Sequence, residues 1–187
     1  NSNLSSKSPG ELYSARLEII KRFEKEHIDS FDLWGVGWNK WKFKIGNKTI
    51  FKSKLFTPNR ISYQGVAPDK LKIMSKYKFS ICFENTCLIE DYISEKIFDS
   101  FLAGTIPIYY GAKNIKELVP VECFIDYRDF KNFKDLFNFI SNMDEKRYLD
   151  YIDNIDSFLK SDKARVLSLR NWKKTIINSV NNVLNKR

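Results

Sequence analysis

The spacing of hydrophobic residues changes twice between residues 77 and 111. Tyr77–Phe83 is a short, β-prone apolar run, and Thr105–Tyr110 is a second one that ends at Gly111. Between them, Ser94–Ala103 has apolar residues at helical spacing and is followed by Gly104. The residues expected to face inward from this helix are Ile97, Phe98, Phe101 and Leu102. A strand, a helix and a strand of this size predict two parallel strands joined by a crossover helix.

Similar patterns flank this unit. Helices are predicted at 8–26, 69–75, 114–118, 130–143, 145–159 and 163–184, and strands at 30–34 and 123–127. In the first helix, Ser8 is the predicted N-cap, Pro9 the first helical residue and Glu11 the capping-box carboxylate. Residues 39–70 are weakly periodic and rich in turn signals, which predicts a long irregular connection and leaves a hairpin open.

This alternation of strands and helices, with nearly continuous apolar strands, is typical of an α/β fold. We predict an open parallel sheet with helices on both faces. Ligands of such sheets bind beyond the carboxyl ends of the strands. The loops of interest are therefore those after Phe83, Tyr110 and Tyr127, together with the segment that enters the first helix at Ser8.

Composition narrows the class of protein. A chain of 187 residues with 43% hydrophobic and 15% aromatic residues predicts one folded domain, alone or with an extension. No apolar run is long enough to span a membrane. The chain starts without a Met or a leader pattern, so we expect it to begin inside a longer protein. The net charge of +9 favours an anionic partner, such as a phosphorylated ligand, a nucleic acid or a membrane surface.

Metal and disulfide chemistry are not indicated. The chain has three cysteines, Cys82, Cys87 and Cys123, and one histidine, His27. A sparse, odd number of cysteines favours a reducing compartment over a disulfide framework. A zinc site of ordinary ligand spacing is not expected with a single histidine.

The start of the helix at residue 94 is the candidate site. A helix N-terminus presents free backbone N–H groups and the positive end of the helix dipole, which suits a phosphate group. Lys96 adds a positive charge that the dipole opposes, and Glu95 adds a negative one. Together they suggest a ligand with an anionic part and a part that becomes positive. The alternative is a solvated first turn, with Asn85 as a turn former and Tyr92 as a packing residue.

Three consecutive segments carry a family resemblance. They read YKFSICFENT at 77–86, DYISEKIFDSF at 91–101 and GTIPIYYG at 104–111, followed by FID at 124–126 and DF at 129–130. This ordered pattern resembles the signature of the α-1,3-fucosyltransferases, glycosyltransferase family 10.

The resemblance implies the C-terminal half of a GT-B glycosyltransferase. Residues 1–160 would form a Rossmann-like domain that binds the donor GDP-β-L-fucose. Residues 161–187 would form a C-terminal helix that packs toward the N-terminal acceptor domain, which lies outside the chain with the catalytic base. The implied reaction inverts the anomeric carbon, requires no metal or other cofactor, and makes an α-fucoside, commonly α-1,3 on N-acetylglucosamine or glucose.

The resemblance also implies roles for individual residues. Lys96 would hold the diphosphate, and Glu95 would be the catalytic residue that faces the fucose and stabilises its developing positive charge. An arginine of the first helix would also bind phosphate, with Arg16 the better match and Arg22 the second. The other substrate-binding residues would be Asn85, Tyr92 and Ser94. For Arg16, a solvent-facing helix charge is the alternative.

Two other classes of function stay open on the sequence. One is a basic α/β module that binds nucleic acid, although the lysines form no stripe interleaved with aromatic residues. The other is a family relative without activity, against which the retained Glu95 and Lys96 count. For the transferase, no nucleic-acid partner is expected.

The expected location of the transferase is the cytoplasm, with a role in protein glycosylation or lipopolysaccharide synthesis. The basic residues near the C-terminus are Lys163, Arg165, Arg170, Lys173 and Lys174. They suit a peripheral contact with the inner membrane, or a solvated face that packs on the missing domain.

Overall fold

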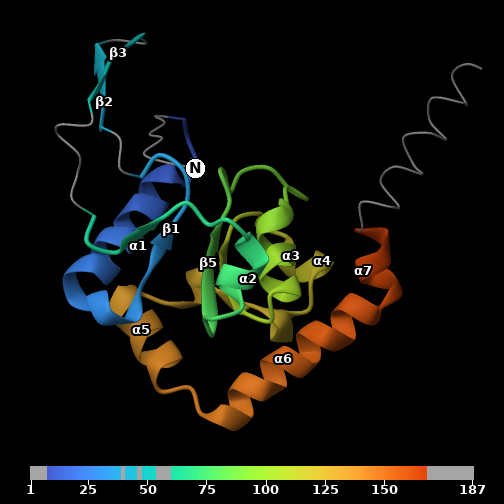
Figure 1. Ribbon diagram of the computed structural model, residues 1–187. Helices are drawn as coiled ribbons and strands as arrows, with labels where there is room; N and C mark the ends of the chain where they lie inside the picture. Colours follow the sequence, from blue (N-terminus) through green and yellow to red (C-terminus); the bar gives the residue numbers. More distant parts are fainter. Residues whose placement is uncertain (1–7, 39–40, 46–47, 54–59, 168–187) are drawn as a thin grey trace, which may run out of the picture.

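A three-stranded parallel sheet forms the centre of the fold. The computed structural model describes residues 8–38, 41–45, 48–53 and 60–167 (Figure 1). Strands β5 (Phe79–Phe83), β6 (Ile106–Tyr110) and β7 (Ile125–Asp126) lie in that order. Helix α3 (Glu95–Leu102) connects the first two strands. The predicted strand–helix–strand unit and its parallel pairing are therefore confirmed, and the carboxyl ends of the strands meet at one edge of the sheet.

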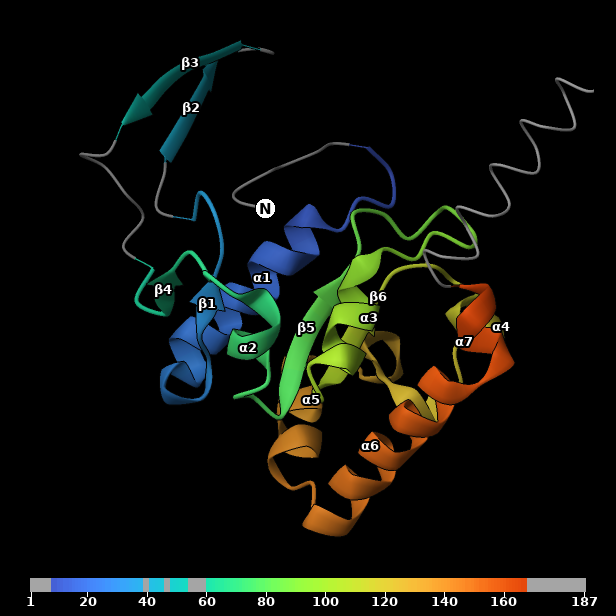
Figure 2. The ribbon, with the colours of Figure 1, turned by 45° about the vertical axis from the view of Figure 1, so that its right-hand side comes forward.

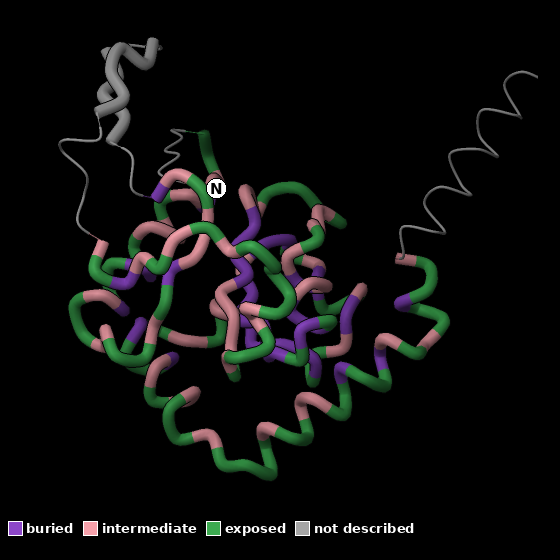
Figure 3. Tube along the Cα trace, viewed as in Figure 1, coloured by how far each residue is buried: buried purple, intermediate pink, exposed green. Residues whose placement is uncertain are grey.

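The core lies around the central strand. Ile106, Ile108 and Tyr109 of β6 are at most 1% exposed. Helix α1 (Tyr13–Glu26) contributes Phe23, which packs edge-on against Phe133 with 4.9 Å between the two ring centroids. In Figure 2, α1 lies on one side of β5 and α3 on the other, and Figure 3 shows the buried positions concentrated in the centre of the molecule around the sheet. Because β6 is covered on both faces, its sequence is almost uniformly apolar rather than alternating.

Two smaller sheets lie outside this core. Strand β1 (Leu33–Trp34) pairs in parallel with β4 (Tyr63–Gly65), and β2 (Trp41–Ile45) forms an antiparallel hairpin with β3 (Lys48–Ser53). The hairpin left open by the sequence is thus present within residues 39–70. Strand β4 was not predicted, because three residues with a central exposed glutamine carry no strand periodicity.

The first helix begins later than predicted. Pro9 lies before the helix, which starts at Tyr13, and Ser8 is not its N-cap. Gly10 has a φ of +69°, a left-handed conformation that separates Ser8 from the helix. The N-cap position is Leu12, whose side chain makes no cap bond. The carboxylate of Glu11 just before it accepts hydrogen bonds from the backbone N–H groups of Tyr13 and Ser14 at 2.9 and 3.2 Å. The predicted capping box starting at Ser8 was therefore wrong, although Glu11 does bind free N–H groups at the start of the helix.

The remaining helices follow the predicted pattern. They are α2 (Lys70–Met74), α4 (Ile115–Leu118), α5 (Phe133–Ser141), α6 (Glu145–Lys160) and α7 (Asp162–Val166). Helices α2, α4 and α5 are shorter than predicted, α6 extends one residue further, and α7 begins one residue earlier. The predicted strand at 123–127 shrinks to β7 because a 3-10 turn occupies each side of it. The prediction that Leu102 of α3 faces inward was wrong, since this residue is 64% exposed. Residues 168–184 of the last predicted helix, with Arg170, Lys173 and Lys174, lie outside the described residues.

None of the helices in the described ranges combines the length and the apolar character that crossing a membrane requires.

The longest described helix, α6, begins at a cap whose contribution can be measured. The side chain of Asp144 accepts a hydrogen bond from the backbone N–H of Arg147 at 2.7 Å. We expect Asp144→Ala to lower the free energy of unfolding by about 1 kcal/mol, as loss of an N-cap does. Urea denaturation measures this. The control Asp153→Ala removes an exposed carboxylate from the middle of α6, and an equal loss there would contradict the assignment of the cap.

Candidate functional site

A buried carboxylate lies where β5 ends. Glu84 directly follows Phe83, and its side chain is fully buried. Its Oε1 accepts hydrogen bonds from the backbone N–H and the hydroxyl of Ser94, at 2.8 and 3.0 Å. Its Oε2 lies 2.8 Å from the Ser94 hydroxyl and 2.9 Å from the Lys96 ammonium. This carboxylate therefore connects the end of β5 to the first turn of α3.

Lys96 is the cation of this cluster. A side chain in the first turn of a helix points back toward the N-terminus. The Nζ atom of Lys96 accordingly lies over the cap of α3, 2.8 Å from the Ser94 hydroxyl as well as 2.9 Å from Glu84. The side chain keeps 25% of its surface exposed. An ammonium has three N–H groups, so one has no partner among the residues that the structure describes.

Arg16 reaches the same edge of the sheet from α1. Its Nη2 donates to the backbone carbonyls of Phe83 and Glu84, at 2.6 and 2.9 Å, and lies 3.3 Å from the side-chain oxygen of Asn85. Burial lowers the pKa of Arg16, and the negative charge of Glu84 opposes that shift. An arginine stays protonated at neutral pH. The structure thus places a second permanent cation beside Glu84 and Asn85.

Arg22, the second arginine considered, lies elsewhere on α1. It pairs with Glu26 at 3.1 Å with 52% of its side chain exposed. The structure therefore brings Arg16, and not Arg22, to the end of β5.

The loop after β5 is tied to the segment that enters α1. The amide of Asn85 lies 3.3 Å from the Tyr92 hydroxyl, and its backbone carbonyl accepts from the N–H of Leu12 at 3.0 Å. The N–H of Cys87 donates to the carbonyl of Gly10 at 2.9 Å. These contacts hold Asn85 and Tyr92 next to Arg16. The sequence placed both segments at the carboxyl edge but did not predict that they pair.

Glu95 stands apart from this network. It is exposed, and it makes no hydrogen bond or ion pair with any residue in the described ranges. Its neighbours Ser94 and Lys96 point their polar atoms toward Glu84. The two adjacent charges of α3 therefore differ: the cation is held in place by Glu84 and Ser94, whereas the carboxylate has no partner among the residues that the structure describes.

Glu84 is the residue whose importance the sequence analysis missed. A signal was available, because a carboxylate immediately after a buried strand must be paired or solvated. Its partners could not be read from the chain, since they come from a turn ten and twelve residues later.

The cysteines do not supply a nucleophile at this site. Burial raises the pKa of the Cys82 thiol to about 11, so it is protonated at neutral pH. Among the residues that the structure describes, no three His, Cys, Asp or Glu side chains are grouped so that they could hold a metal ion.

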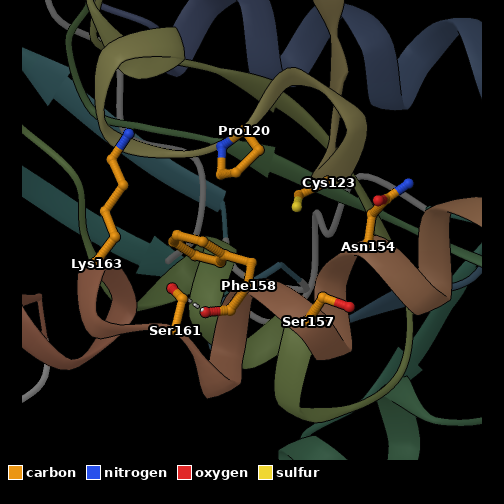
Figure 4. Close-up of a pocket in the computed structure, with 7 residues that line it drawn as sticks. All are labelled: Pro120, Cys123, Asn154, Ser157, Phe158, Ser161 and Lys163. Atoms are coloured by element: carbon orange, nitrogen blue, oxygen red, sulfur yellow. Dashed lines mark hydrogen bonds between the residues drawn. The ribbon is translucent and has the colours of Figure 1, made fainter.

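A separate pocket of about 340 Å³ lies between α6, α7 and the turn before β7 (Figure 4). Its lining residues are Pro120, Cys123, Asn154, Ser157, Phe158, Ser161 and Lys163. Cys123 precedes β7, so the pocket is near the amino end of that strand, whereas Glu84 follows the carboxyl end of β5. It contains none of the predicted site residues.

The parallel sheet, with two cations and a helix N-terminus at its carboxyl edge, is typical of α/β domains that bind phosphorylated ligands. The chain matches the family model described as glycosyltransferase family 10 (fucosyltransferase), C-terminal part, over residues 5–181. Since this match covers nearly the whole chain, the protein belongs to that family, and the resemblance noted in the sequence is confirmed.

Individual relatives share shorter stretches. The chain is 36% identical over 86 residues to an alpha-(1,3)-fucosyltransferase (FucT) of Helicobacter pylori, covering 45% of this chain and 18% of that protein. It is 36% identical over 80 residues to an alpha-(1,4)-fucosyltransferase of Arabidopsis thaliana, covering 42% and 20%. The chain thus spans about a fifth of these curated relatives.

A solved structure shows the same fold. A crystal structure of an alpha1,3-fucosyltransferase with GDP-fucose aligns with 81% of this chain and 37% of its own, with a TM-score of 0.53 and 23% identity. The predicted α/β fold class, a Rossmann-like parallel sheet with flanking helices of the kind found in GT-B fucosyltransferases, is confirmed.

Proposed function

We propose that this chain is the donor-binding domain of an inverting fucosyltransferase. The full protein would move L-fucose from GDP-β-L-fucose to a hydroxyl of an oligosaccharide acceptor, most simply in α-1,3 linkage to N-acetylglucosamine or glucose. The observation that carries this proposal is the Lys96 ammonium, held at the N-terminus of α3 by Glu84 and Ser94 with 25% of its side chain exposed. Family membership supports it, as does the crystal structure of an alpha1,3-fucosyltransferase with GDP-fucose.

The charges of the site suit breakage of a sugar–phosphate bond. That step leaves negative charge on GDP and positive charge on the fucose. Lys96 and Arg16 would meet the first charge together with the free N–H groups of α3, and the exposed Glu95 would meet the second. These protein cations supply the charge that a diphosphate leaving group needs, and no cofactor beyond the donor substrate is part of the proposal.

Asn85, Tyr92 and Ser94 complete the proposed donor site. The first two would contact the nucleotide sugar from the loop after β5. Ser94 would contribute at the cap of α3, where its hydroxyl already contacts Lys96.

The division of the protein follows from the same proposal. Residues 1–160 would bind the donor, and residues 161–187 would pack toward the acceptor-binding part, which would supply the catalytic base. We expect this chain by itself to bind GDP without transferring fucose. The free thiols of Cys82, Cys87 and Cys123 support a cytoplasmic location.

Titration calorimetry of the chain with GDP tests the proposal. We expect saturable binding that Lys96→Ala weakens by at least about tenfold, the loss expected for one hydrogen bond to a charged group. The control Lys134→Ala removes an exposed lysine of α5 and should leave the affinity unchanged within about twofold. Tight, salt-sensitive binding of RNA with no heat from GDP would instead favour the basic nucleic-acid module.

A further inference from the structure

The partners of the buried Glu84 carboxylate come from one place in the fold. Both of its oxygens are occupied, and its partners among the described residues belong to the N-cap and first turn of α3: the Ser94 backbone, the Ser94 hydroxyl and the Lys96 ammonium. A fully buried carboxylate is costly unless it is paired in this way. Glu84 is the one buried glutamate among the described residues, and its contacts orient the cap of α3.

The side chain of Glu84 occupies space that is open because residue 111 is a glycine. A Cβ on Gly111 would lie 2.6 Å from Cγ of Glu84 and 2.3 Å from the Tyr109 hydroxyl. Gly111 does not have a positive φ, so its backbone conformation does not require glycine. Glycine is needed at this position for a steric reason, because a side chain at residue 111 would overlap the side chain of Glu84. The backbone N–H of Glu84 also donates to the Tyr110 carbonyl at 2.8 Å, which joins the two strand ends.

The geometry points to Glu84 as a positioning residue for donor binding, acting through Lys96 and kept in place by the gap at Gly111. This inference rests on the proposed function. Glu84 and the Ser94 hydroxyl take two of the three N–H groups of Lys96, so the third has a defined direction before the ligand arrives. A flexible lysine held in its bound conformation loses less rotamer freedom on binding, and the affinity rises accordingly.

A double-mutant cycle on GDP affinity separates positioning from a general structural role. Glu84→Gln keeps the shape of the side chain but removes the charge that orients Lys96. We expect it to weaken GDP binding by about tenfold when Lys96 is present, and by less than about twofold in the Lys96→Ala background. Thermal unfolding of each variant checks that it folds. Glu122→Gln, which neutralises an exposed carboxylate before β7, serves as the matched control and should not change the affinity.

Gly111→Ala provides an independent probe if Glu84→Gln does not fold. The added methyl group would press on both Glu84 and the Tyr109 hydroxyl without altering any charge. Because it shifts Glu84, it should also weaken GDP binding only when Lys96 is present. Equal losses in the two backgrounds would overturn the inference, and so would tighter GDP binding by Glu84→Gln, which would mean that Glu84 competes with the phosphate. A Lys96→Ala variant with unchanged GDP affinity would instead overturn the proposed function itself.

Discussion

Replacing Glu95 with glutamine is expected to reduce fucosyl transfer by about 100- to 1000-fold, the range seen when one electrostatic contact to a transition state is removed. Glu95 is exposed and unpaired with the described residues, so its charge is available to the substrate. Glutamine keeps the size of the side chain but cannot balance the positive charge that the proposed reaction develops on the sugar. The affinity for GDP, which lacks the sugar, should stay within about twofold.

The measurement is the rate of transfer from GDP-fucose by the full-length protein that carries this chain, alongside calorimetry with GDP. Glu117→Gln removes another exposed carboxylate, on α4, and should preserve the rate. A parallel fall of GDP affinity and transfer rate in Glu95→Gln would show that Glu95 binds the nucleotide, and that its assigned role is wrong.

Truncating Ile97 to alanine is expected to destabilise the fold by about 2–5 kcal/mol, as loss of a fully buried aliphatic side chain does. Ile97 is 0% exposed and follows Lys96 in α3, so its packing anchors the turn that carries the site. Urea denaturation gives the change in free energy of unfolding.

Leu102→Ala is the matched control, because it shortens a large aliphatic side chain on the same helix. Leu102 is 64% exposed, and its truncation should change the free energy of unfolding by about 0.5 kcal/mol or less. Similar losses for the two variants would mean that α3 packs with a different face toward the sheet.

The central sheet could be predicted because its signals are local. Strands β5 and β6 are continuous apolar runs, and α3 between them has helical spacing and a serine cap. Strand β4 escaped prediction because its three residues are held by pairing with β1, thirty residues earlier in the chain. The rotation of α3 was also only partly predictable, since an eight-residue helix can bury Ile97 and still expose Leu102.

The features of the site also divide into those that the sequence indicated and those that only the structure revealed. The sequence pattern singled out Lys96 and Glu95, and the family resemblance added Arg16. The structure places Lys96 and Arg16 at one edge of the sheet. It did not indicate that Glu84 would hold Lys96, or that Arg16 would bind the carbonyls at the end of β5. Both contacts join residues from different elements, so neither leaves a periodic pattern.

By itself, the sequence determined the α/β class, the parallel strand–helix–strand unit, and the family to which the protein belongs. These depend on the order of residues along one stretch of chain, and the sequence shows hydrophobic spacing and motif spacing directly. Only the tertiary structure decided which charged side chains contact one another. Among the described residues Lys96 is paired and Glu95 is not. This difference depends on burial of Glu84 beside Gly111, which arises when strand ends and a helix N-terminus converge in space.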